Sequence, residues 1–218
     1  MDTIEPKIEI VPQKAVLIRT TDYDRDEYDI DSVPVYQIIA HAAQVSHIGG
    51  DAGKRLYGDH AREFVKNLMA WGHWSPFEFF DLTFECTTNR AVSHELVRHR
   101  MASYMQESQR YCDYTKHIRF VVPQKMIDDI DVNEPLAYAA RQYAVVVANG
   151  VKPEDARVIL PECTATTILV KMNLREFRHF LKLRLADGAW HMMRELAGLM
   201  LIAFKERFPD DAFLVENL

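Results

Sequence analysis

Several features that would assign this chain of 218 residues to a familiar class are missing from its sequence. The three cysteines, Cys86, Cys112 and Cys163, are widely spaced and include no Cys-x-x-Cys pair, so neither a disulfide framework nor a zinc ribbon is indicated. We expect them to be reduced thiols. No run approaches the ~20 apolar residues that a membrane-spanning helix requires. No Gly-x-Gly-x-x-Gly loop is present to hold a dinucleotide.

An excess of positive charge is also missing. The net charge of -6 argues against general nucleic-acid binding, which depends on attraction to phosphate. The N-terminal sequence MDTIEPKIEIVPQ is too charged for a secretory signal, so we expect a cytoplasmic protein with no membrane association. The hydrophobic content of 48% is enough for a buried core, and we expect a single domain over residues 1–218.

Hydrophobic periodicity predicts a mixture of helices and strands. The expected helices are Pro34–Ser46, Asp59–Trp71, Arg90–Arg100, Pro135–Ala148, Leu174–Leu183 and Trp190–Phe208, with a further helical start at Lys152–Arg157. The expected strands are Lys14–Thr20, Phe79–Thr88, Phe120–Pro123 and Cys163–Met172, and a polar loop is expected at Asp22–Ser32. This mixture is typical of an α+β fold, in which an antiparallel sheet is flanked by long helices.

The segment Arg98–Tyr111 is the most informative part of the sequence. It gathers three arginines, two serines and two glutamines within an acidic chain. Arginines this close repel one another unless an anion lies among them, and the guanidinium fork matches phosphate oxygens. Hydroxyl and amide groups add the donors and acceptors that a sugar and a base require. The segment therefore predicts a nucleotide site, although an exposed helix end carrying cations remains the alternative.

A zinc site is not indicated in this region. His94 and His99 are five residues apart, whereas the zincin arrangement places its histidines four apart on one helix face. We expect no metal. Ser103, Ser108 and Cys112 also lack the surroundings of a catalytic nucleophile.

The tetrapeptide Ser-Pro-Phe-Glu at 75–78 has the pattern of a capping box, with Ser75 as N-cap and Glu78 as its partner. His73 precedes it, between two tryptophans. From the residues alone, His73 either fills an aromatic cluster or faces a ligand. Similarly, Arg175, Arg178 and Lys182 either bind a ligand or form a solvated helix face.

The segment Arg98–Tyr111 resembles the signature of the flavin-dependent thymidylate synthases, the ThyX family. The matching positions are Arg98, His99, Arg100, Ser103, Ser108, Arg110 and Tyr111. The sequence from His73 to Glu78 and the segments around Arg157, Met172–Phe180 and Arg184 are similar to family segments as well. The resemblance covers about Lys14 to Phe208. It implies the flavin-dependent thymidylate synthase fold, assembled as a homotetramer with shared active sites.

The resemblance also implies two sets of ligands. For the substrate dUMP they are Glu95, Arg98, Gln106, Glu107, Ser108, Gln109, Arg110, Arg157 and Arg184. For FAD they are His73, Ser75, Arg98, His99, Arg100, Gln106, Asn173, Arg175 and His179. Arg184 is the expected catalytic residue, which favours the ionised form of uracil. After Arg184 the match weakens: either Gly188 replaces a histidine that many relatives have, or His191 serves from another turn, and no site is assigned there.

The implied activity is methylation of dUMP to dTMP. Methylenetetrahydrofolate is the carbon donor, and FAD reduced by NADPH is the hydride source. The absence of an evidently activated cysteine agrees with this chemistry, because the usual alternative adds an enzyme thiolate to the pyrimidine. The competing hypothesis is a noncatalytic nucleotide-binding or regulatory homologue. Its support is Met105-Gln106, where many members have Asn-Glu, and the altered segment after Arg184.

Overall fold

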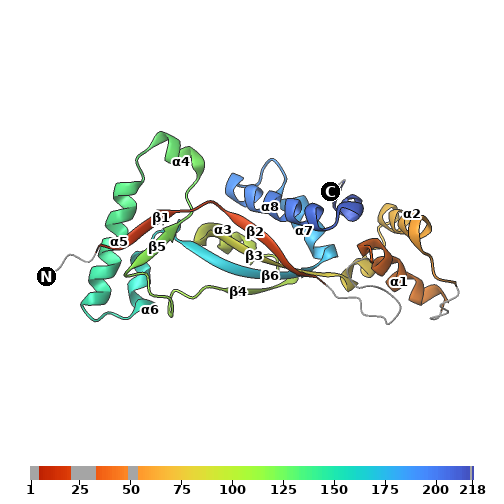
Figure 1. Ribbon diagram of the computed structural model, residues 1–218, viewed down its shortest axis with the longest axis horizontal. Helices are drawn as coiled ribbons and strands as arrows, with labels where there is room; N and C mark the ends of the chain where they lie inside the picture. Colours follow the sequence, from red (N-terminus) through yellow and green to blue (C-terminus); the bar gives the residue numbers. More distant parts are fainter. Residues whose placement is uncertain (1–4, 21–32, 49–53, 217) are drawn as a thin grey trace. The chain divides into compact units, whose positions relative to one another are not determined.

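The computed structural model describes residues 5–20, 33–48, 54–216 and 218 (Figure 1). The strands are β1 (Lys7–Ile10), β2 (Lys14–Thr20), β3 (Asp81–Asn89), β4 (Ala102–Gln106), β5 (His117–Phe120) and β6 (Ala165–Asn173). The α-helices are α1 (Val35–Ile48), α2 (Gly58–Ala70), α3 (Arg90–Leu96), α4 (Gln124–Asp129), α5 (Asn133–Ala148), α6 (Pro153–Ala156), α7 (Leu174–Arg184) and α8 (His191–Arg207). The 3₁₀ helices are η3 (Ser75–Phe79), η4 (Arg157–Ile159) and η5 (Pro209–Val215).

Four strands form a sheet in the order β2-β3-β6-β4, and β1 and β5 form a second, two-stranded sheet. In β3 and β6 buried residues largely alternate with less buried ones, as expected for strands that present one face to a core. The α+β fold with an antiparallel sheet and long helices is confirmed. The β1–β5 pair differs from the expected pairing, because it is parallel, with Lys7 opposite His117.

Contacts divide the chain into two compact units. Unit 1 comprises residues 1–14, 85–98 and 104–169, and unit 2 comprises residues 15–84, 99–103 and 170–218. The chain therefore passes from one unit to the other within β2, β3, β4 and β6, and again between Arg98 and His99. The single domain expected over residues 1–218 stays a prediction.

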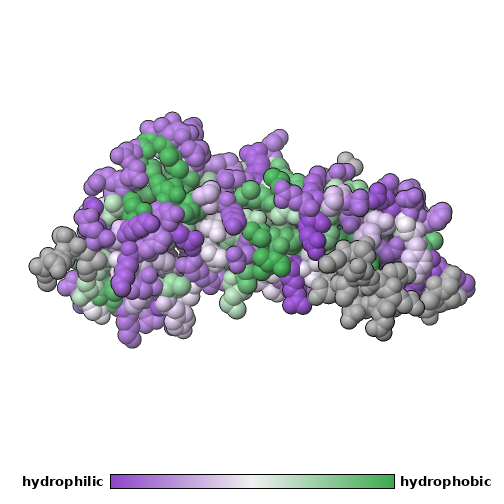
Figure 2. Space-filling model, in the orientation of Figure 1, coloured by the Kyte–Doolittle hydropathy of each residue, from purple (hydrophilic) through white to green (hydrophobic). Residues whose placement is uncertain are grey.

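The core of unit 1 lies between α5 and the β1–β5 pair, which lie side by side in Figure 1. Phe120 of β5 and Tyr143 of α5 are fully buried there. Gly150, with a φ of 88°, follows the C-cap residue Asn149 and terminates helix α5, as expected from the sequence. Figure 2 shows an apolar area beside α4. Among the exposed apolar side chains of this unit are Met126 of α4, Ile130 directly after it and Val145 of α5.

The core of unit 2 is built around α7 and α8, which pack against each other. Phe177 of α7 has its ring centroid 5.3 Å from that of Phe84 and 5.7 Å from that of Phe204. The side chain of Asp211 in η5 accepts hydrogen bonds of 2.9 Å from the backbone N–H groups of Val35 and Tyr36. This buried carboxylate therefore caps the first turn of α1.

Two local predictions were wrong. The helix expected over Arg90–Arg100 ends at Leu96, because the residues from Ala102 onward join the four-stranded sheet as β4. Ser75 begins η3 but makes no capping hydrogen bond, so the predicted capping box is not formed. The carboxylate of Glu78 instead accepts a charge-assisted hydrogen bond of 2.6 Å from Arg175.

The other expected helices and strands are present with ends no more than three residues from those predicted, and the strand expected at Phe120–Pro123 overlaps β5 at Phe120. Strands β1 and β4 and helices α4 and η5 were not predicted from the sequence. The loop expected at Asp22–Ser32 and the Gly49-Gly50 break lie outside the described residues. Within the described ranges, none of the helices combines the length and apolar character needed to traverse a bilayer.

Candidate functional site

The segment that follows β4 in unit 1 is anchored by Glu107. Its backbone N–H donates to the carbonyl of Thr167 at 2.8 Å, and its carboxylate accepts from the Thr167 N–H at 3.1 Å and from the Tyr114 hydroxyl at 2.7 Å. Burial, followed by the hydrogen bond to Glu107, raises the pKa of Tyr114. The carboxylate of Glu107, a predicted dUMP ligand, is thus engaged by its own protein. It fixes the start of the loop that carries Ser108 and Arg110.

The loop itself is a tight turn. The N–H of Cys112 donates to the carbonyl of Ser108 at 2.9 Å, and the hydroxyl of Ser108 accepts from the N–H of Arg110 at 3.3 Å. Gln109 is half-buried, whereas Arg110 is exposed. The guanidinium of Arg110 lies over the ring of Tyr111, 5.5 Å from its centroid. The turn therefore presents Arg110 to solvent on a short, hydrogen-bonded backbone.

Arg110 and Arg157 converge on one residue, Glu154. The Nε of Arg110 donates to the Glu154 carboxylate at 3.3 Å, and the Nε of Arg157 donates to the Glu154 carbonyl at 3.0 Å. Lys152 places its Nζ 3.9 Å from the same carboxylate. Arg110 and Lys152 thus flank the carboxylate of Glu154, and Arg157 lies against the backbone of the same residue. A phosphate group has the charge and the oxygen atoms to take the place of that carboxylate.

Gln106 is held within unit 1. Its Nε2 donates to the hydroxyl of Ser93 at 2.9 Å and to the hydroxyl of Thr166 at 3.2 Å. The predicted ligands Glu95 and Arg98 lie at the end of α3, and the N–H of Arg98 donates to the carbonyl of Glu95 at 3.2 Å. Arg98 is exposed and Glu95 is half-buried.

The predicted FAD ligands of unit 2 surround the start of α7. The side chain of Asn173 is the N-cap of this helix and accepts from the N–H of Glu176 at 2.9 Å. Arg175 follows it and pairs with Glu78 of η3. His73 and Ser75 lie just before and at the start of η3, and both are exposed, as is Arg100. The ring of His73 also contacts Trp71, with 5.8 Å between centroids, as the aromatic-cluster alternative requires.

A hollow of about 290 Å³ opens beside α7 in unit 2. Its lining consists of Trp74, Arg175, Arg178, His179, Lys182 and Leu218. The guanidinium of Arg178 lies 4.8 Å from the centroid of a Trp74 ring and donates to the carbonyl of Leu214. Burial lowers the pKa of Arg178. Arg175 and His179 were predicted from the resemblance as FAD ligands, whereas Arg178 and Lys182 were left open. Arg178 follows Arg175 by three residues and Lys182 follows His179 by three residues, and this helical spacing was the available signal.

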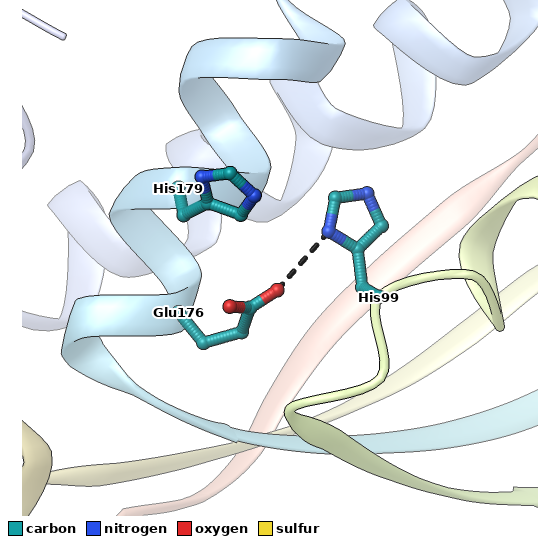
Figure 3. Close-up of side chains that lie close together, drawn as sticks. All are labelled: His99, Glu176 and His179. Atoms are coloured by element: carbon teal, nitrogen blue, oxygen red, sulfur yellow. Dashed lines mark hydrogen bonds and ion pairs between the residues drawn. The ribbon is translucent and has the colours of Figure 1, made fainter.

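His99 lies buried beside the same helix. Its Nδ1 is 3.1 Å from the carboxylate of Glu176, and its Nε2 accepts a hydrogen bond of 2.9 Å from the Nε of Arg184. Figure 3 shows His99, Glu176 and His179 pointing toward one another. Burial is the main cause that lowers the pKa of His99 below its ordinary value of 6.5. The predicted catalytic residue, Arg184, is thereby tied to a neutral imidazole.

The same three side chains also have the composition of a metal site, since possible ligand atoms of His99, Glu176 and His179 lie within 4.8 Å of one another. Both ring nitrogens of His99 already have protein partners, one of which is the cationic Arg184. A metal ion at Nε2 would have to displace that guanidinium. The hydrogen-bonded network accounts for the cluster better than a metal ion does.

A model of the family described as thymidylate synthase complementing protein matches residues 30–210. The chain belongs to this family. All the predicted ligands, from His73 to Arg184, fall within the matched residues.

Relatives of this family member carry the name flavin-dependent thymidylate synthase. The protein of Pyrococcus furiosus is 35% identical over 182 residues, which are 78% of this chain and 75% of that protein. The protein of Pyrobaculum aerophilum is 43% identical over 156 residues, 69% of this chain and 62% of that protein. The protein of Geobacter sulfurreducens is 37% identical over 163 residues, 72% of this chain and 70% of that protein.

Solved structures resemble this family member in fold. A UMP/dUMP methylase PolB from Streptomyces cacaoi, bound with 5-Br dUMP, has a TM-score of 0.79 at 23% identity; the match covers 94% of this chain and 96% of that one. The flavin-dependent thymidylate synthase ThyX from Helicobacter pylori, complexed with FAD and dUMP, has a TM-score of 0.70 at 20% identity and covers 94% and 98%.

Within each unit the structure brings part of the predicted site together. In unit 1 it gathers Arg110 and Arg157, with Ser108 in the same turn as Arg110. In unit 2 it gathers His99, His179 and Arg184, while Arg175 lies on the same helix. The assignment of each residue to dUMP or FAD stays a prediction.

Proposed function

We propose that this chain is a flavin-dependent thymidylate synthase that methylates dUMP to dTMP. The proposal takes methylenetetrahydrofolate as the carbon donor and NADPH as the source of electrons for FAD. The observation that carries it is the family match over residues 30–210, which includes every residue of both predicted ligand sets. The proposal keeps the cytoplasmic location expected from the sequence.

The hollow beside α7 fits the cofactor. Arg175, Arg178 and Lys182 provide cationic partners for a pyrophosphate, and Trp74 provides a flat apolar surface beside them. We assign FAD to this hollow, with His179 at its edge and His73, Ser75, Arg100 and Asn173 as the further ligands carried over from the family. When bound, FAD supplies the hydride.

For the substrate, we assign the phosphate of dUMP to Arg110 and Arg157. The present anionic partner of Arg110, Glu154, has a side chain that is 38% exposed, and an exposed ion pair is worth only ~0–1 kcal/mol, so a phosphate displaces it at little cost. Arg157 donates to a backbone carbonyl and keeps its full charge. Ser108 and the backbone from Gln106 to Arg110 supply donors for the sugar and base. Glu107 acts by holding this backbone in place.

Arg184 has the electrostatic role. Electron density must increase at C5 of the uracil ring before that carbon can accept the methylene group, and a fixed cation stabilises the negative charge that develops on the ring. The Nε–H of Arg184 donates to His99 and so fixes that edge of the guanidinium. The proposal places the Nη edge toward the pyrimidine.

We also propose a homotetramer whose active sites are shared between subunits. Large apolar side chains near the predicted ligands support an interface, since Met101, Met105 and Tyr111 are 74%, 72% and 81% exposed. An assembly would remove these surfaces from water.

The test is formation of dTMP by the purified protein. With FAD, dUMP, methylenetetrahydrofolate and NADPH all present, we expect dTMP to accumulate over many turnovers, measured by liquid chromatography with mass detection. Omission of FAD or of NADPH should each abolish accumulation. Binding of dUMP and FAD without any dTMP would instead favour the noncatalytic alternative.

A further inference from the structure

His99 bridges two turns of α7. Glu176, Phe180 and Arg184 recur every four residues along this helix, so their side chains lie on one side of it. The imidazole contacts all three: Nδ1 reaches Glu176 at 3.1 Å, Nε2 reaches Arg184 at 2.9 Å, and the ring meets Phe180 nearly edge-on, with 5.0 Å between centroids. His99 and Glu176 are 5% and 8% exposed. The arrangement is therefore buried and fixed by packing.

The two hydrogen bonds determine where the imidazole carries its proton. The Nε of Arg184 is always a donor, so Nε2 of His99 must be the acceptor, and its proton must be on Nδ1. The Nδ1–H then donates to the carboxylate of Glu176. A neutral ring is required, since a protonated imidazole has no acceptor for Arg184.

The charged groups around the ring agree with that state. Burial lowers the pKa of His99, and the charges of Arg184 and His179 lower it further, whereas Glu176 alone raises it. All three of these residues are on α7, and His99 reaches them from the turn between α3 and β4.

We propose that Glu176 and His99 form a hydrogen-bonded relay that positions Arg184 for its role in the reaction. This inference rests on the proposed function, in which Arg184 stabilises charge on the pyrimidine. Glu176 holds the tautomer and orientation of His99, and His99 in turn holds the Nε edge of the guanidinium. Because the carboxylate of Glu176 faces His99 rather than the lining of the hollow, Glu176 is a positioning residue that need not touch dUMP or FAD.

The decisive variant is Glu176→Gln, assayed at saturating FAD. The amide has nearly the same shape, but its NH₂ group can donate to Nδ1 and so favour the tautomer that carries its proton on Nε2. In that tautomer the N–H on Nε2 of His99 would face the Nε–H of Arg184, and the hydrogen bond between them would be lost. We expect kcat to fall at least tenfold while the dissociation constants of dUMP and FAD change less than twofold. Glu176→Asp keeps the charge and should recover part of kcat. Glu63→Gln, an exposed change on α2, is the matched control and should leave kcat unchanged.

The pH profile separates positioning from simple structural support. In the unmodified protein, kcat should fall on the acid side with a midpoint below pH 6.5, as His99 gains a proton and loses its acceptor. Glu176→Gln removes the one charge that raises the pKa of His99, so the midpoint should move to lower pH. A variant that merely loosened the fold would lower the melting temperature and leave this midpoint in place.

Each outcome decides between the hypotheses. If Arg184→Ala keeps full turnover, the proposed role of Arg184 fails. If Arg184→Ala loses turnover while Glu176→Gln keeps the kcat and acid midpoint of the unmodified protein, the relay alone is overturned. Should Glu176→Gln fail to fold, Glu176→Asp decides: its carboxylate is withdrawn by one methylene, so a lowered kcat with unchanged dUMP affinity supports the relay, and an unchanged kcat overturns it.

Discussion

The candidate ligands of unit 1 and of unit 2 are held in opposite ways. In unit 1 the side chains of Arg110 and its partner Glu154 are 52% and 38% exposed, and they project from a loop and a short helix. In unit 2 the side chains of His99 and Glu176 are 4% and 10% exposed, and they pack on a long helix. The exposed pair of unit 1 can exchange partners at little cost in free energy. In the buried pair of unit 2, removal of one partner leaves the other without a hydrogen bond, which costs much more free energy.

This difference matches the tasks that we propose for the two units. A phosphate must enter and leave at every turnover, so a weak surface pair that yields to it is an advantage. A group that stabilises developing charge must already be in position, because reorganisation during the reaction would raise the barrier. In unit 1 the rigidity lies in the backbone, through Glu107; in unit 2 it lies in the side chains.

The largest expected effect concerns the buried, preorganised cluster of unit 2. Arg184→Ala should lower kcat by at least ~100-fold, the scale observed when a single electrostatic donor is removed, while dUMP affinity falls less than ~tenfold. Stopped-flow turnover and equilibrium dUMP binding measure the two quantities. Equal losses in both would make Arg184 only a ligand and would remove the distinction between the units.

The next largest effect concerns the exposed ion pair of unit 1. Arg110→Ala or Arg157→Ala should weaken dUMP binding by about tenfold or more, since a charge-assisted hydrogen bond contributes ~1.5–3 kcal/mol. FAD affinity should not change. Lys152→Ala, which removes a more distant cation beside Glu154, is the control and should have a smaller effect. Titration calorimetry with dUMP measures these affinities. If both arginine variants bind dUMP as tightly as the unmodified protein does, the phosphate binds elsewhere.

A smaller effect is expected on stability alone. Asp211→Ala removes the acceptor of two backbone N–H groups at the start of α1 and should lower the free energy of unfolding by ~1–2 kcal/mol. Asp211→Asn keeps one acceptor and should lose less. Urea unfolding followed by circular dichroism checks both; a loss in Asp211→Asn as large as in Asp211→Ala would show that the charge, not the acceptor, caps the helix.

The smallest effect is expected from the thiols. Cys86 is fully buried, and burial raises its pKa to about 12; burial also raises the pKa of Cys163. Neither favours the thiolate that a nucleophile requires. Replacing Cys86, Cys112 and Cys163 by serine should leave kcat within about twofold in the folded variant. If a single Cys→Ser change abolishes dTMP formation while dUMP and FAD still bind, a thiolate adduct replaces the hydride mechanism.

Much of this architecture follows from local sequence patterns. The helical pattern of 174–183 predicted α7 to within one residue, and the β-rich composition of 14–20 predicted β2 at its observed ends. Strand β4 was not predicted because it lies inside the segment Arg98–Tyr111, which was interpreted as a set of ligand groups. The alternating exposure of its residues is that of an edge strand. A strand's pairing depends on residues far along the chain, which local patterns do not contain.

In the candidate site, too, some residues could be predicted from the sequence and others could not. The resemblance named Arg110, His99 and Arg184, but Glu154, the partner of Arg110, and Glu176, the partner of His99, came from the structure. Glu154 is read from sequence as part of a helix start, and Glu176 as one more charge in a first turn. What makes each of them important is the tertiary contact with an arginine or a histidine, and no spacing rule predicts that contact.

The C-terminal residues Leu214, Glu216 and Leu218 lie beside the hollow next to α7, and this has a practical consequence for handling the protein. Arg178 holds the backbone at Leu214 and Glu216, and Leu218 lines the hollow assigned to the cofactor. Residues fused after Leu218, such as a purification tag, would begin at the edge of that hollow and compete for its cations. Flavin content should therefore be compared between amino-terminally tagged and carboxyl-terminally tagged preparations before a colourless sample is taken as evidence of weak cofactor binding.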